Sequence, residues 1–378
     1  VRITGSYNEI RPEHHVIDHT LKHKENTYFG ELIYGHSFLA GQGLFTGGIS
    51  YREKLVENAP VWETNLLSYL NPENEGNEAL LPKITNTDYD TCLWSLFGQY
   101  SHKIGEIDLW LGVRNDSHDT YQNKISFNAG TNWSPCSQWI FKLLYGTAYR
   151  TSFARKFWEK KFSLPDLEQI DSLNFQVAWK PYENAGVSIC AYTSRIKNHI
   201  MEDPYTKLSL PNKQDINGVE IEGNISPHRM LNFSASLSML NNSGPNEKYS
   251  YKAYYDAHGM LKGYLDLEYP FDSGPDILFN LTGTWRPTDS LTAFLRLSYV
   301  GPRQLIYFQS DTEKFSTRTC SGVWQLDMNA IVRDIIMPGL DMELSVENMA
   351  DTRYETPGTY NTIEGNPFSV KAVFRKKW

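Results

Sequence analysis

Apolar and polar residues alternate with a period of two along most of the 378-residue chain, as they do in a β-strand with one apolar and one polar face. In segment 231–239 the odd positions carry leucine, phenylalanine, alanine and methionine, whereas the even positions carry asparagine and serine. The clearest segments are Ile107–Val113, Ile125–Trp133, Leu173–Trp179, Leu231–Met239, Ile277–Trp285, Leu291–Tyr299 and Trp324–Val332. With less regular segments such as Tyr28–His36 and Gly186–Arg195, the alternation predicts about sixteen strands of roughly the 9–11 residues that cross a bilayer at a tilt.

The connections between these segments alternate between short and long. The short ones are Lys103–Gly105, Ser134–Ser137, Glu183–Asn184, Ser226–His228 and Arg286–Asp289. The long ones are Glu9–Glu25, Leu55–Asp90, Arg150–Asp171, Lys197–Lys213, Asn242–Pro275, Gly301–Ser321 and Met349–Asn366. Outer-membrane barrels have short periplasmic turns and longer extracellular loops. Counting hairpins on this basis predicts that the last strand descends and that the C-terminus is periplasmic.

Charged and aromatic residues follow the same alternation. A lysine or arginine that faces lipid at mid-depth costs about 2–4 kcal/mol. The charged residues on the polar parity, which we expect to face a lumen, are Asp108, Lys142, Glu220, Glu222, Arg296, Asp327, Glu343 and Lys371. On the apolar parity, Trp133, Trp139, Trp179 and Trp285 lie beside short turns, and Trp94, Tyr149, Tyr299 and Trp324 lie near long connections. These are two interfacial aromatic belts, so the sequence predicts an all-β, antiparallel transmembrane β-barrel. A soluble β-sandwich or propeller explains the alternation but not the belts.

Composition agrees with this fold. Aromatic residues make up 13% of the chain although the mean hydropathy is −0.48, which fits apolar side chains interleaved with polar ones. No run approaches the roughly 18 consecutive apolar residues that a membrane helix needs. The net charge of −8 argues against a nucleic-acid partner. The four cysteines, Cys92, Cys136, Cys190 and Cys320, show no metal-like spacing. Cys190 stands in mid-strand, so we expect a free thiol there, whereas Cys92 and Cys320 fall near the same rim, nothing in the sequence pairs them, and their disulfide state stays open.

Several segments resemble motifs of TonB-dependent outer-membrane receptors. Glu347–Tyr354, with the sequence ENMADTRY, resembles the ENLFDxRY segment near the C-terminus of that family. Tyr145–Ser152 followed by Leu164–Glu168 resembles its YGxxFRAP and NPDLxPE stretch, and Asn217–Gly223 resembles its xGxExEx strand. These segments stand in the family's order, and the chain ends on an aromatic residue, Trp378. Departures, such as Thr-Ser in place of Ala-Pro and a final Trp in place of Phe, bear on the ligand subclass more than on the fold.

The resemblance implies that residues 1–378 are the later strands of a plugged barrel of about 22 strands, and that the plug and the TonB box lie outside this sequence. Because the chain opens in an apparent strand, Val1–Tyr7, without a signal peptide, we expect the protein to begin earlier. The resemblance also implies a receptor in the outer membrane of a Gram-negative cell. Such a receptor binds a nutrient outside the cell and imports it with energy from the TonB–ExbB–ExbD complex, which acts on the plug. A ferric siderophore is the first expectation for the cargo, and haem, cobalamin, a metal or an oligosaccharide remain open.

Two other functions remain open on sequence grounds. One is a passive diffusion porin that closes on sixteen strands, and the other is a structural scaffold inside a larger envelope complex. A plug-like domain upstream would favour the importer, whereas a signal peptide directly before Val1 would favour the porin. No nucleophile elbow, HExxH motif or Walker loop occurs, so we predict neither enzymatic activity nor a cofactor.

Two groups of basic and aromatic residues in the long connections are candidates for ligand binding. Arginine and aromatic side chains together suit a bulky anionic ligand, through charge-assisted hydrogen bonds and stacking. The first group contains Arg155 and Trp158, which equally suit lipopolysaccharide phosphates at the outer rim. The second group is an aromatic vestibule, for which packing between loops is the alternative; it contains Tyr254, Tyr255, Arg303, Tyr307 and Phe308.

Histidines recur in the first long connection. His15, His19 and His23 are four residues apart, a spacing that would align the imidazoles on one face of a helix and suit a transition metal or haem iron. A solvated loop with incidental histidines is the alternative, since no cysteine or carboxylate cluster completes a coordination shell.

Overall fold

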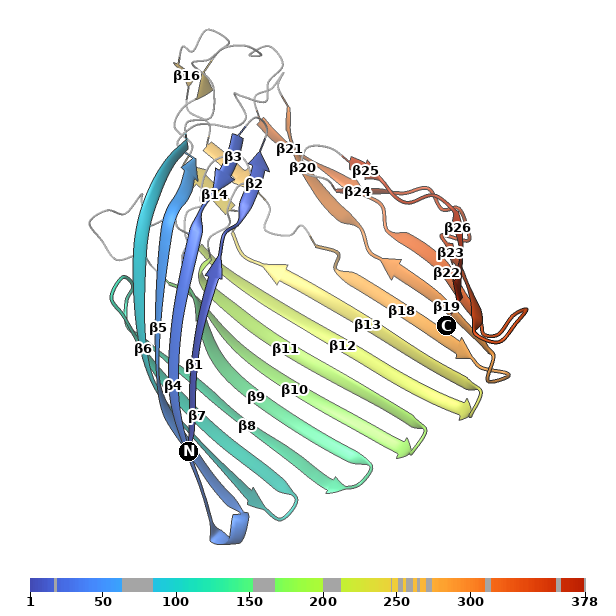
Figure 1. The fold of residues 1–378 in the computed structure, drawn as a ribbon, viewed down its shortest axis with the longest axis horizontal. Coiled ribbons are helices and arrows are strands. Elements are labelled where there is room, and N and C mark those ends of the chain that lie inside the picture. The colour runs from blue at the N-terminus through green and yellow to red at the C-terminus, as the bar shows by residue number, and fades with distance from the viewer. Residues whose placement is uncertain are drawn as a thin grey trace.

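The structure is a computed structural model that describes residues 1–16, 19–62, 84–151, 167–199, 212–245, 247–250, 254–255, 261–263, 266–269, 274–309, 314–357 and 362–376. Strands and turns account for almost all of these residues (Figure 1). The one helical element in the described part of the chain is a single 3₁₀ turn, η1 (Leu39–Gly41). Among the described residues, no helix is long and apolar enough to cross a membrane.

The main element is one antiparallel sheet of 16 strands in which neighbours in sequence are neighbours in space (Figure 1). Its strands are, in order, β1 (Arg2–Ile10), β4 (Lys24–Phe38), β5 (Gly43–Trp62), β6 (Ile84–Ile104), β7 (Ile107–His118), β8 (Lys124–Cys136), β9 (Trp139–Arg150), β10 (Glu168–Tyr182), β11 (Ala185–His199), β12 (Asn212–His228), β13 (Leu231–Ser243), β18 (Ile277–Trp285), β19 (Leu291–Val300), β22 (Val323–Val332), β23 (Leu340–Glu347) and β26 (Ser369–Lys376). Each segment that alternates clearly in the sequence lies within one of these strands, so the all-β, antiparallel prediction is confirmed.

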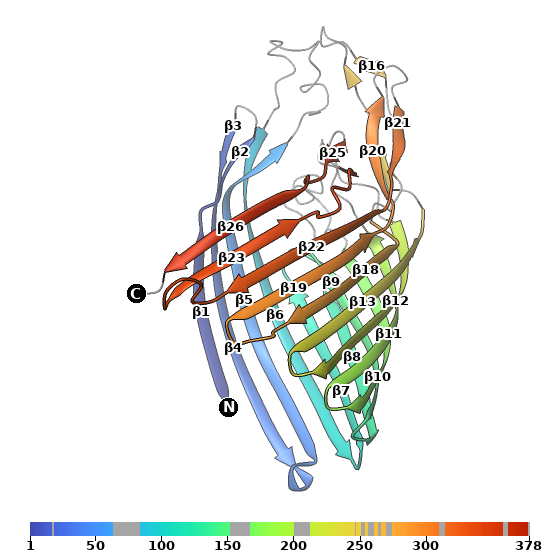
Figure 2. The same cartoon turned by 90° about the vertical axis from the view of Figure 1, so that its right-hand side faces the viewer.

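The two rims of the sheet differ as the lengths of the connections predict. One, here called the turn rim, carries short turns such as 183–184 and 286–290. The other, the loop rim, carries the long connections and five small hairpins (Figure 2). The hairpins pair β2 (Glu13–Val16) with β3 (His19–Lys22), β14 (Glu247–Ser250) with β17 (Asp266–Tyr269), β15 (Tyr254–Tyr255) with β16 (Leu261–Gly263), β20 (Arg303–Gln309) with β21 (Lys314–Cys320), and β24 (Glu355–Pro357) with β25 (Thr362–Glu364). The last strand, β26, runs from the loop rim toward the turn rim.

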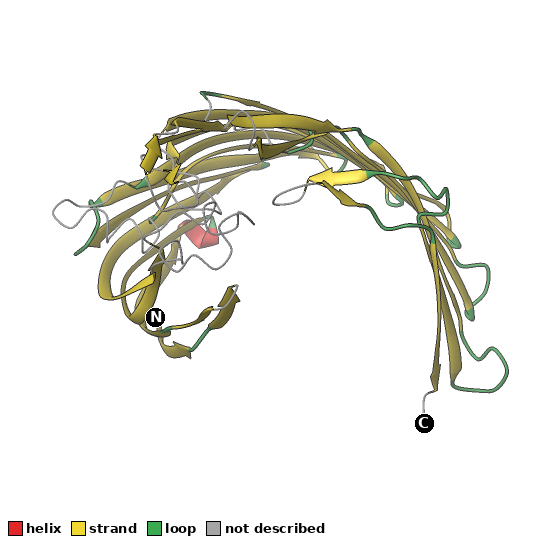
Figure 3. Ribbon diagram, turned by 90° about the horizontal axis from the view of Figure 1, so that it is seen from above, coloured by secondary structure: helices red, strands yellow, loops and turns green. Residues whose placement is uncertain are grey.

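The sheet curves into an open arc. Seen from above, the strands bend around a central space, and the ends of the arc, at β1 and β26, stand apart (Figure 3). Within the described part of the chain, β1 pairs only with β4 and β26 pairs only with β23, so each has one edge without a neighbouring strand. Such an edge leaves backbone N–H and C=O groups that require partners inside a lipid bilayer.

The two faces of the sheet differ in polarity and in packing. On β7 every odd position is exposed, with Leu111 at 59% and Val113 at 46%, whereas the even positions except Asp108 are half-buried or buried. Side chains on the concave side of a curved sheet converge and cover one another, so the even positions face inward. The charges predicted to face the lumen include an ion pair on this concave face. Arg296 on β19 is the cross-strand partner of Asp327 on β22, and its Nη2 lies 2.6 Å from Asp327 Oδ2.

The convex face carries the aromatic belts. Trp133, Trp179 and Trp285 are 40–48% exposed near the turn rim, and Trp94 and Trp324 are about half exposed near the loop rim. The rings pack against one another along each belt, stacked near the turn rim and tilted near the loop rim. The distance between ring centroids is 5.6 Å for Trp139 and Trp179 near the turn rim, and 4.8 Å for Tyr299 and Trp324 near the loop rim.

The prediction for Tyr149 is wrong. Its hydroxyl donates to Asp116 Oδ2 at 2.7 Å, and Asp116 belongs to the concave face of β7. The regular pairing of β8 with β9 ends at Gly146, and the amide of Phe127 donates to the hydroxyl of Thr147 instead of to the backbone. Beyond that point β9 keeps its pairing with β10 but not with β8, and the side chain of Tyr149 reaches Asp116 on β7 on the side that β8 leaves open.

All four cysteines are free thiols, which agrees with the expectation for Cys190.

Candidate functional site

A network of polar side chains lies on the concave face just below the loop rim. We call it the concave cluster; its members are Ser95 on β6, Arg114, Asp116 and His118 on β7, and Tyr149 on β9. Arg114 donates through Nε to Asp116 Oδ1 at 2.8 Å and through Nη2 to Ser95 Oγ at 2.7 Å. The Asp116 carboxylate, only 2% exposed, is thus held by a guanidinium and a phenol at once.

His118 extends the concave cluster toward the loop rim. Its Nε2 lies 3.0 Å from the Tyr149 hydroxyl, and its ring meets the Tyr121 ring edge-on, with centroids 5.4 Å apart. Tyr121 stands in the short connection between β7 and β8 and is 4% exposed. Burial raises the pKa of the Tyr121 hydroxyl, which therefore stays protonated at neutral pH. This connection is fixed in turn by the amide of Cys92, which donates to Asp119 Oδ1 at 2.8 Å.

Beside the concave cluster is a cavity of about 390 Å³ that opens to the inside of the arc. Its lining residues are Phe29, Ser50, Arg52, Leu93, Arg114, Asp116, Ser126, Thr147, Ala148 and Tyr149. Arg52, on β5, is exposed and has no hydrogen-bond or ion-pair partner among the described residues. In the same part of the chain, the buried hydroxyl oxygen of Ser126 has no hydrogen-bond partner either.

The cavity can hold an anionic, oxygen-rich group. Two guanidinium groups, those of Arg52 and Arg114, face one carboxylate, Asp116, so the lining carries an excess of positive charge. Guanidinium groups bind carboxylates and phosphates through paired, charge-assisted hydrogen bonds. Asp116 already fixes Arg114, so the unpaired Arg52 is the group with its donors free for a ligand.

The Glu347–Tyr354 segment, which carries the family resemblance, serves to fix a loop. Asn348, at the end of β23, is 1% exposed and has a positive φ of 49°, a conformation that asparagine tolerates better than most residues. Its side-chain Nδ2 donates to the carbonyls of Thr352 and Asn366, each at 3.0 Å, and its Oδ1 accepts from the Thr352 amide at 2.9 Å. The Asn348 amide donates to Asp327 Oδ1 at 2.9 Å, which ties this corner to β22.

The binding residues predicted from the sequence are only partly placed. Arg155 and Trp158 lie outside the described residues. Tyr254 and Tyr255 form β15, whose backbone pairs with β16. The other three, Arg303, Tyr307 and Phe308, lie together on β20, in the hairpin with β21. The structure thus gathers these three on one hairpin, and a role for all seven in ligand binding stays a prediction.

The helix that would align the three histidines is not what the structure shows, because His15 and His19 lie on β-strands. His15 lies on β2 and His19 on β3, and the two strands form a hairpin in which His15 is opposite Thr20 and Val16 is opposite His19. His23 follows directly after β3. A four-residue spacing aligns side chains only on a helix, so the argument for a shared imidazole face does not apply here. Across the described residues, no group of three or more His, Cys, Asp or Glu side chains is arranged to hold a metal ion.

Sequence reasoning missed the concave cluster. Its one local signal is that Arg114, Asp116 and His118 occupy successive polar positions of a single strand, on the parity of Asp108. The partners Ser95 and Tyr149, and the cavity residue Arg52, are contributed by three other strands. Only the curvature of the sheet brings them together.

Comparison with known families settles the class of protein. The family model described as "TonB dependent receptor-like, beta-barrel" matches residues 4–348. The chain belongs to the TonB-dependent receptor β-barrel family. This is a family of outer-membrane receptors and transporters rather than of enzymes. A search among curated proteins finds no match.

Solved structures of TonB-dependent receptors have the same fold at low identity. The FrpB iron transporter from Neisseria meningitidis (F3-3 variant) matches with a TM-score of 0.66 at 14% identity, over 95% of this chain and 56% of FrpB. The ferripyoverdine receptor of Pseudomonas aeruginosa, bound to ferripyoverdine, matches with a TM-score of 0.65 at 14% identity, over 99% of this chain and 52% of that receptor. The ferric-catecholate import receptor Fiu from E. coli K12 matches with a TM-score of 0.63 at 12% identity, over 94% of this chain and 55% of Fiu. The chain therefore spans about half the length of these receptors.

Proposed function

We propose that this chain forms much of the wall of a TonB-dependent outer-membrane transporter that imports a scarce nutrient, with a ferric siderophore as the leading cargo. Membership in the family, which covers residues 4–348, is the observation that carries the proposal. The similar structures include an iron transporter, a ferric-catecholate import receptor and a ferripyoverdine receptor. In this proposal the loop rim faces the outside of the cell, and the C-terminus is periplasmic.

The cavity beside the concave cluster supports a ligand that carries negative charge. It lies on the concave face near the loop rim, where a nutrient that enters from outside first meets the wall. The free donors of Arg52, the fixed guanidinium of Arg114 and the hydroxyl of Ser126 all border it. Catecholates, carboxylates and phosphates are the chemical groups that such donors bind best. The binding residues predicted in the long connections, including Arg155, Trp158 and the β20 residues, would add contacts to the same ligand.

The open edges of the sheet support a larger barrel. Completion of the wall by further strands between β1 and β26 would satisfy the backbone groups that both edges leave unpaired. It would also agree with receptors of about twice this length. A passive porin that closes on these sixteen strands is less well supported, since β1 and β26 stand apart (Figure 3). The TonB–ExbB–ExbD complex would act through a plug inside the completed barrel.

Growth of a deletion strain on defined ferric siderophore, haem or cobalamin as the sole source tests the transport proposal. We expect loss of growth on one source and rescue by the full-length gene. Unchanged uptake of all three nutrients would refute these cargoes.

An Arg52→Ala variant tests the site separately. We expect about tenfold weaker binding of the anionic cargo, because one charge-assisted contact is lost. Arg286→Ala is the matched control, since it removes an arginine in a turn at the opposite rim. If deletion abolishes uptake but Arg52→Ala and Arg286→Ala bind equally well, the protein is a transporter and the ligand site lies elsewhere.

A further inference from the structure

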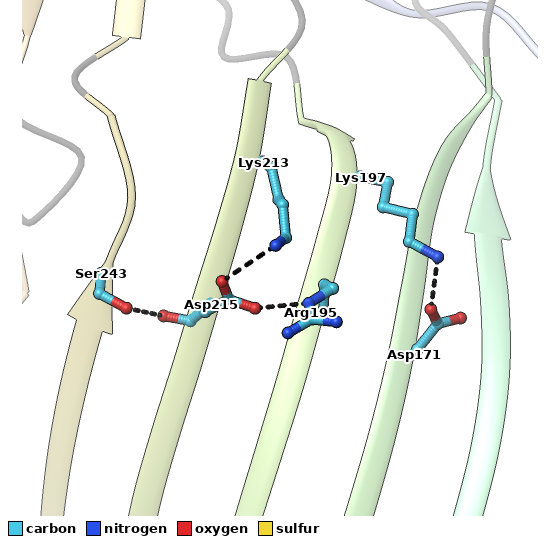
Figure 4. Close-up of polar contacts among 6 residues, drawn as sticks. All are labelled: Asp171, Arg195, Lys197, Lys213, Asp215 and Ser243. Carbon is cyan, nitrogen blue, oxygen red and sulfur yellow. Dashed lines mark hydrogen bonds and ion pairs between the residues drawn. The ribbon is translucent and has the colours of Figure 1, made fainter.

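A charged patch interrupts the convex face where the apolar band ends. We call it the convex patch; it consists of Asp171 on β10, Arg195 and Lys197 on β11, and Lys213 and Asp215 on β12 (Figure 4). One row of side chains crosses four neighbouring strands, since Asp171 pairs with Arg195, Arg195 with Asp215, and Asp215 with Ser243. Lys197 and Lys213 are partners in the next row toward the loop rim.

Strand register places this patch on the outside of the wall. Pairing between β10 and β11 is regular from Asp171 to Trp179, so the residues of odd number in this stretch of β10 share a face. Leu173, Phe175 and Trp179 on that face are 40–46% exposed apolar side chains. Asp171 is the next residue of the same series, so the row turns its side chains toward the medium that surrounds the barrel.

The height of the patch matches the surface of a bilayer. From Trp179, in the belt near the turn rim, to Asp171 is about 20 Å along the membrane normal at the strand rise and tilt usual for such barrels. Apolar bands of outer-membrane barrels are about 25 Å tall. The first charged row therefore lies where acyl chains give way to lipid head groups. Ion pairs deeper in the wall, such as Arg296 with Asp327, stand on the concave face instead.

The patch has more cationic groups than its acids neutralise. Arg195 Nε donates to Asp215 Oδ1 at 2.8 Å, Lys197 Nζ donates to Asp171 Oδ2 at 2.9 Å, and Lys213 Nζ lies 3.6 Å from Asp215 Oδ2 (Figure 4). Three bases thus share two carboxylates. The terminal nitrogens of Arg195 have no partner among the described residues, and the side chains of Arg195 and Lys213 are each 54% exposed. On β4, β5 and β6 the same end of the convex face carries three acids, Glu53, Glu57 and Asp90, and one base, Lys24.

We propose that the convex patch binds the phosphate groups of an anionic lipid in the leaflet at the loop rim. The carboxylates hold the three cationic groups in two adjacent rows and leave the Arg195 terminal nitrogens and both ammonium groups to donate to phosphate oxygens. A head group with two phosphates matches a patch that extends across two strands better than a head group with one. The site lies on the outside of the wall, so the proposal is independent of which nutrient passes through the inside.

The test is lipid binding by the full-length protein in detergent, measured by native mass spectrometry with diphosphoryl lipid A, monophosphoryl lipid A and phosphatidylethanolamine as probes. We expect affinity to fall in that order. The combined variant Arg195→Gln, Lys197→Gln and Lys213→Gln should bind diphosphoryl lipid A about 100-fold more weakly, because each basic group at a membrane surface contributes about fivefold. The control Lys142→Gln, Arg296→Gln and Lys371→Gln makes the same change in charge on the concave face and should bind as the natural protein does.

A second variant covers the case in which the first fails to fold. Asp171→Asn with Asp215→Asn removes the competing carboxylates and should tighten binding of diphosphoryl lipid A severalfold. Equal lipid affinity in the triple variant and the natural protein would overturn the proposal, as would an equal loss in the concave control. Loss of binding on addition of EDTA would also overturn it, because it would mean that divalent ions, rather than the basic side chains, hold the lipid. If millimolar inorganic phosphate displaced the bound lipid completely, the ligand of the convex patch would be a free phosphate anion and not a lipid, which would also overturn the proposal.

Discussion

Two adjacent residues on β19 give the sharpest test of which face meets lipid. Leu295 is 45% exposed on the convex face, and its cross-strand neighbours there are Gly283 and Met328. It lies inside the apolar band, two residues along β19 from the row of Trp285 and four from the row of Tyr299. Leu295→Arg would place a cation inside the bilayer. Such a change costs about 2–4 kcal/mol at the midplane of outer-membrane barrels, which is about 30- to 900-fold in the folding equilibrium.

The assay is reversible folding of the full-length protein into phosphatidylcholine vesicles, followed by urea titration and heat-modifiable gel mobility. Ser298→Arg is the matched control, since it introduces the same residue on the same strand but on the concave face. We expect it to change the free energy of unfolding by less than about 1 kcal/mol. Arg296→Leu should also cost less than about 1 kcal/mol, because its ion pair with Asp327 has a half-exposed arginine. If Leu295→Arg and Ser298→Arg were equally tolerated, the assignment of the faces would be wrong.

Three further substitutions test the packing described above. Tyr149→Phe removes a hydroxyl donor from the buried carboxylate of the concave cluster and should lower the free energy of unfolding by about 1–3 kcal/mol in the same urea titration; no change would mean that the hydroxyl faces water. Asn348→Ala removes three side-chain hydrogen bonds at a buried corner and should cost about 2–4 kcal/mol and speed proteolysis of the connection that follows, and Asn348→Asp, which keeps the acceptor but sets a buried carboxylate against two carbonyl oxygens, should cost at least as much. Gly130→Ala places a Cβ 2.2 Å from the Trp110 ring and should cost about 1–3 kcal/mol with a shift in tryptophan fluorescence, while Gly30→Ala, with open space around its Cβ, should do neither.

The strands and their faces could be predicted because one local rule governs them. A residue that contacts lipid differs in polarity from its sequence neighbours, so period two is visible in segments such as Leu231–Met239 without knowledge of the partner strands. The period-two rule fails where backbone pairing with a neighbouring strand ends, as it does between β8 and β9. Tyr149 has the parity of the outer face, but beyond Gly146 no backbone pairing with β8 holds it there, and its hydroxyl bonds to Asp116.

The candidate site could not be predicted in this way, because its parts are far apart in sequence. Arg52 and Tyr149 border one cavity, although they lie on β5 and β9 and are separated by three other strands. The curvature and register of the whole sheet determine which lumen-facing residues contact one another. Neither can be read from the sequence of a single strand. The histidine prediction failed for a related reason: a four-residue spacing has meaning only once the backbone is helical, and His15 and His19 lie on opposite strands of a hairpin.

The turn that Asn348 fixes at the end of β23 affects how the sequence of the loop rim can change over evolution. One side chain holds both ends of the connection between β23 and β26, so the positions of these two strands depend less on the length of the stretch between them. Insertions, deletions or grafted recognition sequences between Glu355 and Glu364 can then alter what the rim recognises while the strands on either side stay in register. The Glu347–Tyr354 segment thus fixes where this connection begins and ends, while the sequence between those points is free to vary in length.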